Sequence, residues 1–239
     1  EQQQDGEVIE ARKGEVSLKA KIDSIDAQLA ETTTEVGEAF SKSIVINPNT
    51  TVKPYMTIID DDGRIEVLTK LKPLAIANDI PITLAIPINY NHTSAPLTQA
   101  DLLDLQNNLG WEIASHSYSH ANLRVMTDEQ IDFELRESKK ALRRMGLDVK
   151  NFVAPFGSND DPRVRKIAAK YYNCCPKVGG GINTKPVKNQ FLNRVALGSY
   201  TSEGKNTLEF YKSQVDLAVA KNGWLIFMTH SHSPDHDET

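Results

Sequence analysis

Short apolar, β-branched segments alternate with helix-forming segments over most of this chain, and this alternation constrains the fold more than any other feature. The candidate strands are Ile82–Ile88, Trp111–Ala114, Phe152–Ala154, Val195–Leu197 and Trp224–Met228. Regular alternation of strand-forming and helix-forming segments is typical of parallel strands joined by crossover helices. The sequence therefore predicts an α/β fold with a parallel sheet.

Two of the intervening helices have recognisable boundaries. Thr98, between Leu97 and Leu102, has the pattern of an N-cap with a hydrophobic staple. The segment Thr127–Gln130 has the form of a capping box, and Gly146 is a natural stop for the helix that begins there.

Acidic and histidine side chains stand where the predicted strands end. Asp60, Asp61 and Asp62 follow the apolar stretch Met56–Ile59, while His116, the tripeptide Pro155-Phe156-Gly157 and His230 each follow a later strand. In folds of this class the carboxyl ends of the strands carry the chemistry. We therefore expect these residues to meet at one edge of the sheet.

The residue types indicate a metal-dependent hydrolase. One carboxylate with His116 and His120, four residues apart, can ligate a divalent metal, and a second carboxylate with His230 would remain for proton transfer. Each element alone also has a plainer interpretation: a solvated acidic turn before Gly63, and histidines on a helix surface or in a core. A non-haem iron oxygenase could use the same ligands, but the alternating βα pattern counts against its β-sandwich barrel.

Composition excludes several other classes. A net charge of -5 and a pI near 5.7 argue against nucleic acid as a partner. No apolar run approaches the ~20 residues of a membrane span, so none is predicted. The adjacent Cys174 and Cys175 are interpreted as a buried, inert pair.

The N-terminal part has a different pattern, and the composition changes between residues 41 and 55. Apolar side chains recur there on alternating steps of four and three residues, as in a coiled-coil seam: Leu18, Ile22, Ile25, Leu29, Thr32, Val36 and Ala39. We expect residues 1–45 to form a linker and helical coiled coil, and residues 46–239 to form one large domain. Because the chain begins with Glu1, we expect a processed protein or a piece of a longer one.

Four segments, in this order, resemble the motifs of the polysaccharide deacetylase family (NodB-homology, carbohydrate esterase family 4). They are Thr57–Gly63, Glu112–Leu123, Ala154–Gly157 and Leu225–His230, within a similarity that covers roughly residues 53 to 232. The resemblance implies a distorted (β/α)7 barrel that removes acetyl groups from an N-acetylated cell-envelope polysaccharide. An O-acetyl ester hydrolase on acetylated glycans and a catalytically silent carbohydrate-binding module are the alternatives.

The resemblance also implies roles for single residues. It makes Asp61 the catalytic base, His230 the general acid, and Asp62, His116 and His120 the ligands of a divalent metal, which is zinc by ligand type, with cobalt or nickel as other options. Pro155, Phe156 and Gly157 would bind substrate, with the Phe156 N–H as oxyanion donor. Asp60 stands where the family usually has an apolar residue, and a register with Asp60 and Asp61 as the active pair is the alternative.

The chain departs from the family pattern at two points. The arginine that often precedes the proline motif is replaced by Val153 and Ala154, and Arg194 or Asn159 could supply its contact. No clear Asp-x-x-Asp-Trp motif stands between residues 177 and 194, so the sequence does not identify the partner of His230 and leaves a weak or inactive enzyme open. His232 and His236 lie beyond the last motif and are predicted to be exposed tail residues.

Residues 5–29 resemble the short linker repeats of phage tail and baseplate proteins. This resemblance implies display on a phage or prophage tail, an extracellular or virion location, and a homotrimer formed through the N-terminal helix. An ordinary flexible linker or amphipathic helix is the alternative interpretation.

Overall fold

The computed structural model describes residues 53–91, 94–198 and 207–231, which belong to one compact unit of the chain. Its elements, in chain order, are β1 (Tyr55–Asp61), η1 (Val67–Leu71), α2 (Lys72–Ala77), β2 (Thr83–Ile86), α3 (Gln99–Leu109), β3 (Glu112–Ser115), η2 (Leu123–Val125), α4 (Asp128–Arg144), η3 (Pro155–Asp160), α5 (Pro162–Ala168), η4 (Asn189–Phe191), β4 (Val195–Ala196), α6 (Leu208–Ala220) and β5 (Trp224–Thr229). The coiled coil and linker predicted for residues 1–45, the trimer built on them, and His232 and His236 lie outside the described residues. The domain boundary near residue 46 stays a prediction.

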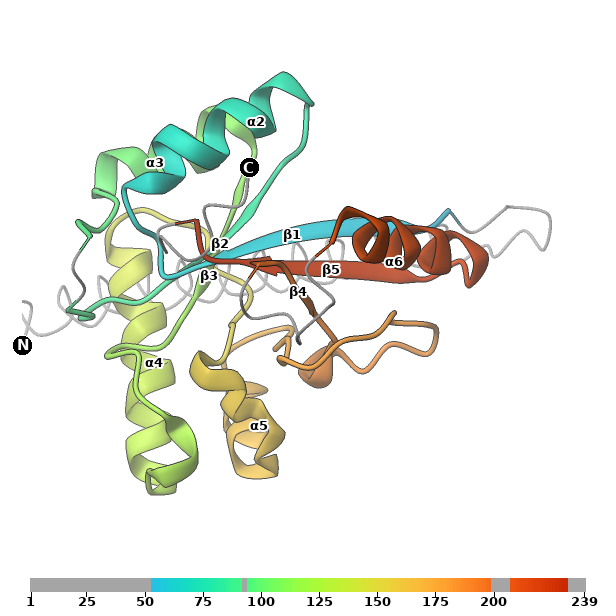
Figure 1. Ribbon diagram of the computed structural model, residues 1–239. Helices are drawn as coiled ribbons and strands as arrows, with labels where there is room; N and C mark the ends of the chain where they lie inside the picture. The colour runs from blue at the N-terminus through green and yellow to red at the C-terminus, as the bar shows by residue number, and fades with distance from the viewer. Residues whose placement is uncertain (1–52, 92–93, 199–206, 232–239) are drawn as a thin grey trace, which may run out of the picture. The chain divides into compact units, whose positions relative to one another are not determined.

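The five strands of the described chain form one parallel sheet in the order β3-β2-β1-β5-β4 (Figure 1). β1 occupies the centre, where Ile59 pairs with Thr83 of β2 on one side and with Met228 of β5 on the other. Consecutive strands in the sequence are joined through helices, as parallel pairing requires. The predicted α/β fold with a parallel sheet is confirmed.

Further backbone pairings continue the sheet into a ring. Phe152 forms a parallel bridge with Ser115 at the end of β3, and its N–H donates to the Cys174 carbonyl at 3.1 Å. Pro176 in turn bridges Leu192, which leads into β4. Seven backbone segments therefore close on one another, as in a distorted barrel. The strand predicted for residues 152–154 is reduced to this bridge, because η3 begins at Pro155.

Helices α3 and α4 begin at the N-cap residues that the sequence predicts. Thr98 caps α3 in a capping box with Asp101, and Thr127 caps α4 in a capping box with Gln130. After α4 the backbone reverses at Gly146, whose φ of 87° is one that glycine adopts readily. These caps fix where each helix enters the fold and so which face it turns to the strands.

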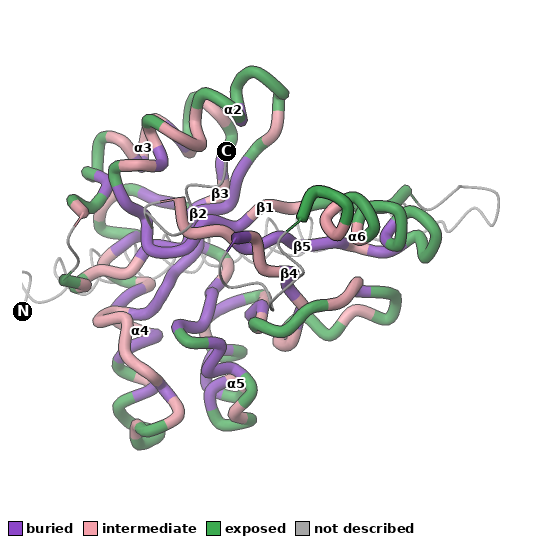
Figure 2. The backbone as a smooth tube through the Cα atoms, in the orientation of Figure 1, coloured by how far each residue is buried: buried purple, intermediate pink, exposed green. Residues whose placement is uncertain are grey.

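The main hydrophobic cluster lies between the strands and helices α3, α4 and α5. From α4 it receives Ile131, Leu135 and Leu142, all fully buried. Figure 2 shows the central strands buried and α6 largely exposed; Ala218 is the one residue of α6 that is buried. None of the helices in the described ranges is both long and apolar enough to cross a membrane.

The two cysteines are free thiols in an apolar setting. Cys175 is buried and Cys174 is partly buried. Burial raises the pKa of the Cys174 thiol to about 12, so it stays protonated and unreactive at neutral pH. This agrees with the interpretation of an inert pair.

Candidate active site

The acidic triplet sits at the carboxyl end of the central strand. β1 runs through Asp61, so Asp60 and Asp61 belong to the strand and only Asp62 follows it, which corrects the expectation that all three lie beyond the strand. The chain then turns at Asp62 and Gly63, with φ of 78° and 56°. The φ of Gly63 favours glycine, and a Cβ there would lie 2.3 Å from the Ile86 Cδ1 atom, so a side chain at this position would strain the backbone and force Ile86 to move.

Asp62 meets both histidines of the predicted ligand set. Its Oδ1 lies 3.1 Å from His120 Nε2 and 3.5 Å from His116 Nε2, and one ligand atom of each residue falls within 4.8 Å of the others. Burial would raise the pKa of the Asp62 carboxyl, but the contacts with the two histidines lower it overall. The carboxylate is therefore ionised at neutral pH, as a metal ligand must be.

The tautomer of His116 is fixed by Nδ1, the ring nitrogen that does not face Asp62. Nδ1 lies 2.7 Å from the Val153 carbonyl oxygen, which can only accept, so Nδ1–H donates and Nε2 carries the lone pair on the side of Asp62. Burial lowers the pKa of His116 to about 4, which keeps the ring neutral at pH 7. A neutral imidazole oriented by a backbone carbonyl is the usual form of a histidine ligand.

The histidines are carried by a loop and not by a helix. Ser117 and His120 have positive φ, 67° and 55°, a conformation that costs a non-glycine residue about 1–2 kcal/mol. Buried Glu134 of α4 holds this loop by accepting bonds from the Tyr118 N–H at 2.9 Å and from the Ser119 N–H and hydroxyl at 2.8 and 2.7 Å. Sequence reasoning missed Glu134.

The signal for Glu134 was an acidic residue at a core position of a helix. Its neighbours at helical spacing, Ile131, Leu135 and Ser138, are all buried. A carboxylate on the buried face of a helix needs polar partners. The helical spacing thus marks Glu134 as a buried acid, while the groups that it holds are visible only in the structure.

Asp61 is paired with a buried arginine. Arg194 Nη1 donates to both carboxylate oxygens, at 2.9 and 3.0 Å, and both side chains are almost fully buried. Burial alone would raise the pKa of Asp61, but Arg194 and the nearby imidazoles of His116 and His230 lower it. Of the two residues that could replace the family arginine, Arg194 makes the contact, whereas the Asn159 amide donates to the Cys175 carbonyl.

His230 and Asp60 lie at the neighbouring strand ends. His230 Nε2 is 4.0 Å from Asp61 Oδ2, and burial lowers the pKa of the imidazole. Asp60 is fully buried, accepts a 2.7 Å bond from the Ser231 N–H, and has a pKa that burial raises well above its usual value. The carboxylate that faces His116 and His120 is thus Asp62, which favours the register anchored on Gly63; the catalytic roles remain proposals.

The proline motif forms a strained turn beside the histidines. Phe156 has φ 56° and ψ 17°, and Gly157 has φ 63°, both in the left-handed region. Pro155 is buried, whereas Phe156 is 61% exposed with its ring 5.0 Å from that of His120. On this strained turn the predicted oxyanion residues lie next to the metal-ligand cluster.

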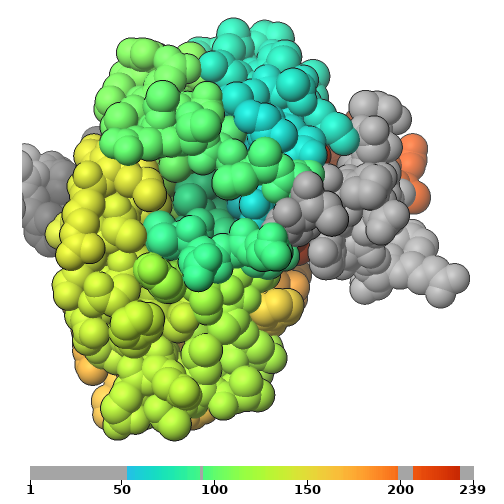
Figure 3. Space-filling model, turned by 90° about the vertical axis from the view of Figure 1, so that its left-hand side faces the viewer, coloured from blue at the N-terminus to red at the C-terminus, as the bar shows by residue number. Residues whose placement is uncertain are grey.

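Aromatic and basic side chains extend the site on the other side of His120. The Tyr90 ring stacks on His120 with 4.1 Å between centroids, and the Arg64 guanidinium lies 4.7 Å from the Tyr90 ring centroid. Both residues line a pocket of about 220 Å³ that reaches Asp62. Figure 3 views the molecule from the side toward which the strands' carboxyl ends point, where the segments after β1, β2 and β3 form the surface. Sequence reasoning did not single out Tyr90 or Arg64.

Solved structures of similar fold include a polysaccharide deacetylase and a domain of a xylanase. A polysaccharide deacetylase from Bacillus cereus has a TM-score of 0.54 and 22% identity, over 66% of this chain and 50% of that one. The Xyl-CE4 domain of a multidomain xylanase from the hindgut metagenome of Trinervitermes trinervoides has a TM-score of 0.52 and 19% identity, over 77% of this chain and 76% of that one. At this identity they show a shared fold.

Sequence comparison is more specific. Chitin deacetylase 1 of Cryptococcus neoformans var. grubii is 35% identical over 78 residues, which are 32% of this chain and only 16% of that relative. The model of the family described as polysaccharide deacetylase matches residues 49–173, just over half of the chain. That range contains the acidic triplet, both histidines of the cluster and the proline motif. The chain belongs to the polysaccharide deacetylase family.

Proposed function

We propose that this domain is a metal-dependent deacetylase that removes acetyl groups from an N-acetylated cell-envelope polysaccharide. The observation that carries the proposal is the cluster of Asp62, His116 and His120 beside the Asp61–Arg194 pair. Membership of the family supports hydrolysis of an acetyl group as the reaction. The nature of the polysaccharide comes from the resemblance of the motifs.

The donor set suits a divalent metal. Two neutral imidazole nitrogens and one ionised carboxylate would hold zinc, and cobalt or nickel would accept the same ligands. When bound, such an ion polarises a carbonyl and makes a neighbouring water more acidic. The tautomer of His116 and the low pKa of Asp62 prepare these ligands in advance, because neither has to lose a proton first.

The remaining residues would move the protons. Arg194 holds Asp61 ionised and oriented, so that Asp61 can take the proton of the attacking water as its oxygen adds to the acetyl carbon. The Phe156 N–H would stabilise the oxyanion. Burial keeps His230 neutral at pH 7, so it must first receive a proton, and Asp61, 4.0 Å away, can pass on the proton that it has taken from the water. His230 would then protonate the amine as the C–N bond breaks, leaving acetate and a free amino sugar.

Acetate release tests this function. Metal-free and zinc-loaded protein would be incubated with chitooligosaccharides, peptidoglycan and acetylxylan. We expect zinc-dependent release from an N-acetylated substrate. Release from acetylxylan alone would identify an O-acetyl ester hydrolase, and binding of a glycan without any release would identify a catalytically silent carbohydrate-binding module.

The N-terminal segment would determine where this activity is displayed. We propose a homotrimeric coiled coil through residues 18–39 on a phage or prophage tail, which would place the domain outside the cell or on the virion. The support is the heptad spacing and the resemblance of residues 5–29 to tail linkers. Light scattering on the whole chain and on one beginning at Ser43 tests it, since a monomer in both cases contradicts the trimer.

A further inference from the structure

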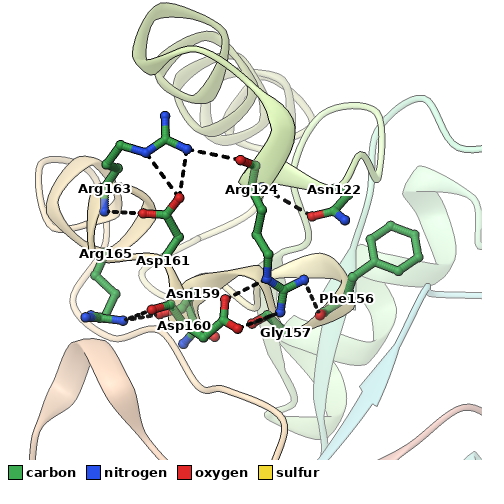
Figure 4. Close-up of polar contacts among 9 residues, drawn as sticks. All are labelled: Asn122, Arg124, Phe156, Gly157, Asn159, Asp160, Asp161, Arg163 and Arg165. Carbon is green, nitrogen blue, oxygen red and sulfur yellow. Dashed lines mark hydrogen bonds and ion pairs between the residues drawn. The ribbon is translucent and has the colours of Figure 1, made fainter.

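A network of arginines surrounds the strained turn that carries Phe156. Arg124, Arg163 and Arg165 all donate to groups in or next to η3 and α5, as Figure 4 shows. Arg124 belongs to η2 and follows His120 by four residues, so it comes from the same loop region as the metal-ligand histidines. It therefore joins the two parts of the candidate site that lie on different elements.

Arg124 contacts both ends of the turn. Its Nη1 donates to the Phe156 carbonyl at 3.0 Å, and its Nη2 donates to the Gly157 carbonyl at 3.0 Å. Nε and Nη2 also donate to the two carboxylate oxygens of Asp160, at 2.7 and 3.0 Å. The hydrogen bonds from Arg124 lower the pKa of Asp160, which stays ionised. A planar guanidinium can make this set of contacts at once, whereas a lysine ammonium cannot.

These contacts act on the two residues with left-handed backbone. Phe156 and Gly157 both have positive φ, and a bulky residue such as Phe156 keeps this conformation only when its surroundings hold it. The Phe156 carbonyl lies in the peptide plane after the Phe156 Cα, and the Phe156 N–H lies in the plane before it. With φ at 56° and ψ at 17°, fixing the first plane restrains the second and so the direction of the N–H. The same restraint holds the ring 5.0 Å from that of His120.

We propose that Arg124 is a positioning residue for the reaction: it holds the Phe156 N–H in the direction that stabilises the oxyanion. The catalytic half of this inference rests on the proposed function, because the oxyanion forms only if the domain hydrolyses an acetyl group. The structural half does not depend on it. With its side chain 35% exposed and its carboxylate partner Asp160 57% exposed, Arg124 can be replaced with little effect on global folding.

The chain offers a matched control in Arg163. This arginine belongs to the same network and is similarly exposed, but it donates to the Met126 and Arg124 carbonyls and to Asp128 and Asp161. It makes no contact with the Phe156 or Gly157 carbonyl in the described structure. Replacing Arg163 therefore removes a comparable set of surface bonds without releasing the turn.

The first readout needs no activity. Amide hydrogen exchange of the segment 155–161 would be followed by mass spectrometry in wild type, Arg124→Ala, Arg124→Lys and Arg163→Ala. We expect faster exchange in both Arg124 variants, unchanged exchange in Arg163→Ala, and similar melting temperatures in all four proteins. Unchanged exchange in Arg124→Ala would overturn the proposal.

The second readout separates positioning from general structure. On an acetylated substrate, Arg124→Ala and Arg124→Lys should lower kcat by about 10- to 100-fold with KM nearly unchanged, the effect of a misplaced oxyanion donor. Added guanidinium ions should partly restore Arg124→Ala and not Arg124→Lys, while Arg163→Ala keeps wild-type kinetics. Equal kcat losses in Arg124→Ala and Arg163→Ala would overturn the catalytic role. If the wild-type protein releases no acetate, the proposed function is contradicted instead. The hydrogen-exchange experiment then still tests whether Arg124 restrains the turn at Phe156 and Gly157.

Discussion

Replacing Arg194 by methionine should destabilise the protein strongly, because it leaves a charge buried without its partner. Both carboxylate oxygens of Asp61 accept from Arg194, and the two side chains are 1% and 4% exposed. Breaking a buried ion pair from one side costs about 3–5 kcal/mol. Without Arg194, burial should raise the pKa of the Asp61 carboxyl above the usual value for an aspartate, and Asp61 would then take up a proton more readily.

The same substitution should cost far less when Asp61 is already an amide. In an Asp61→Asn background Arg194 is the buried charge without its partner, so Arg194→Met removes that charge and mainly loses the bond to the Lys177 carbonyl, worth roughly 1 kcal/mol. Urea unfolding of the wild type, both single variants and the double variant, in metal-free buffer at pH 7, gives the coupling energy. We expect about 2–4 kcal/mol, while additivity within about 0.5 kcal/mol would refute a direct buried pair.

Three further predictions concern the metal ligands and their supports. His120→Ala should abolish metal retention, and stoichiometric metal in this variant, measured by elemental analysis, would contradict the ligand set. Glu134→Gln should weaken zinc affinity about 10- to 100-fold in a chelator competition, whereas Ser138→Ala, a buried polar residue one turn further along α4, should leave it unchanged. His116 has a pKa of about 4 in the fold against 6.5 for an ordinary histidine, so the unfolded chain binds the proton first. The metal-free protein should therefore lose stability as pH falls from about 6.5 to 4, with His116 contributing roughly 3 kcal/mol. A His116→Asn variant should lose this contribution and keep only that of the remaining groups, such as His230, whose pKa burial also lowers.

Much of the fold could be predicted from local patterns. The caps at Thr98 and Thr127 could be predicted because both signals are local: the hydrophobic staple of Leu97 and Leu102 marks Thr98, and the capping box with Gln130 marks Thr127. The parallel sheet followed from alternating βα segments. The extent of the strand at Phe152 was less predictable. Phe152 pairs with Ser115 through a single bridge, and the 3-10 helix η3 already begins at Pro155.

The site divides in the same way. Asp62 and His116 could be placed together because each follows a predicted strand of one parallel sheet and these ends meet at one edge, and His120 stands only four residues after His116. The Arg194–Asp61 pair joins residues 133 positions apart, so one sequence could only suggest Arg194 beside Asn159. Glu134 acts through backbone N–H groups, which leave no mark in residue types, and its role emerged only with the loop.

Metal content and acetate release, measured together on wild type, Asp61→Asn and Asp60→Asn after zinc loading, test the central claim most directly. An amide keeps the shape of the aspartate but cannot accept a proton from water. We predict one zinc per chain and acetate release in the wild type, and one zinc per chain without release in Asp61→Asn. Loss of zinc from Asp61→Asn, with Asp60→Asn inactive but loaded, would move the active pair by one residue. A wild-type protein that binds zinc and releases no acetate from any of the three substrates would contradict the proposed deacetylase.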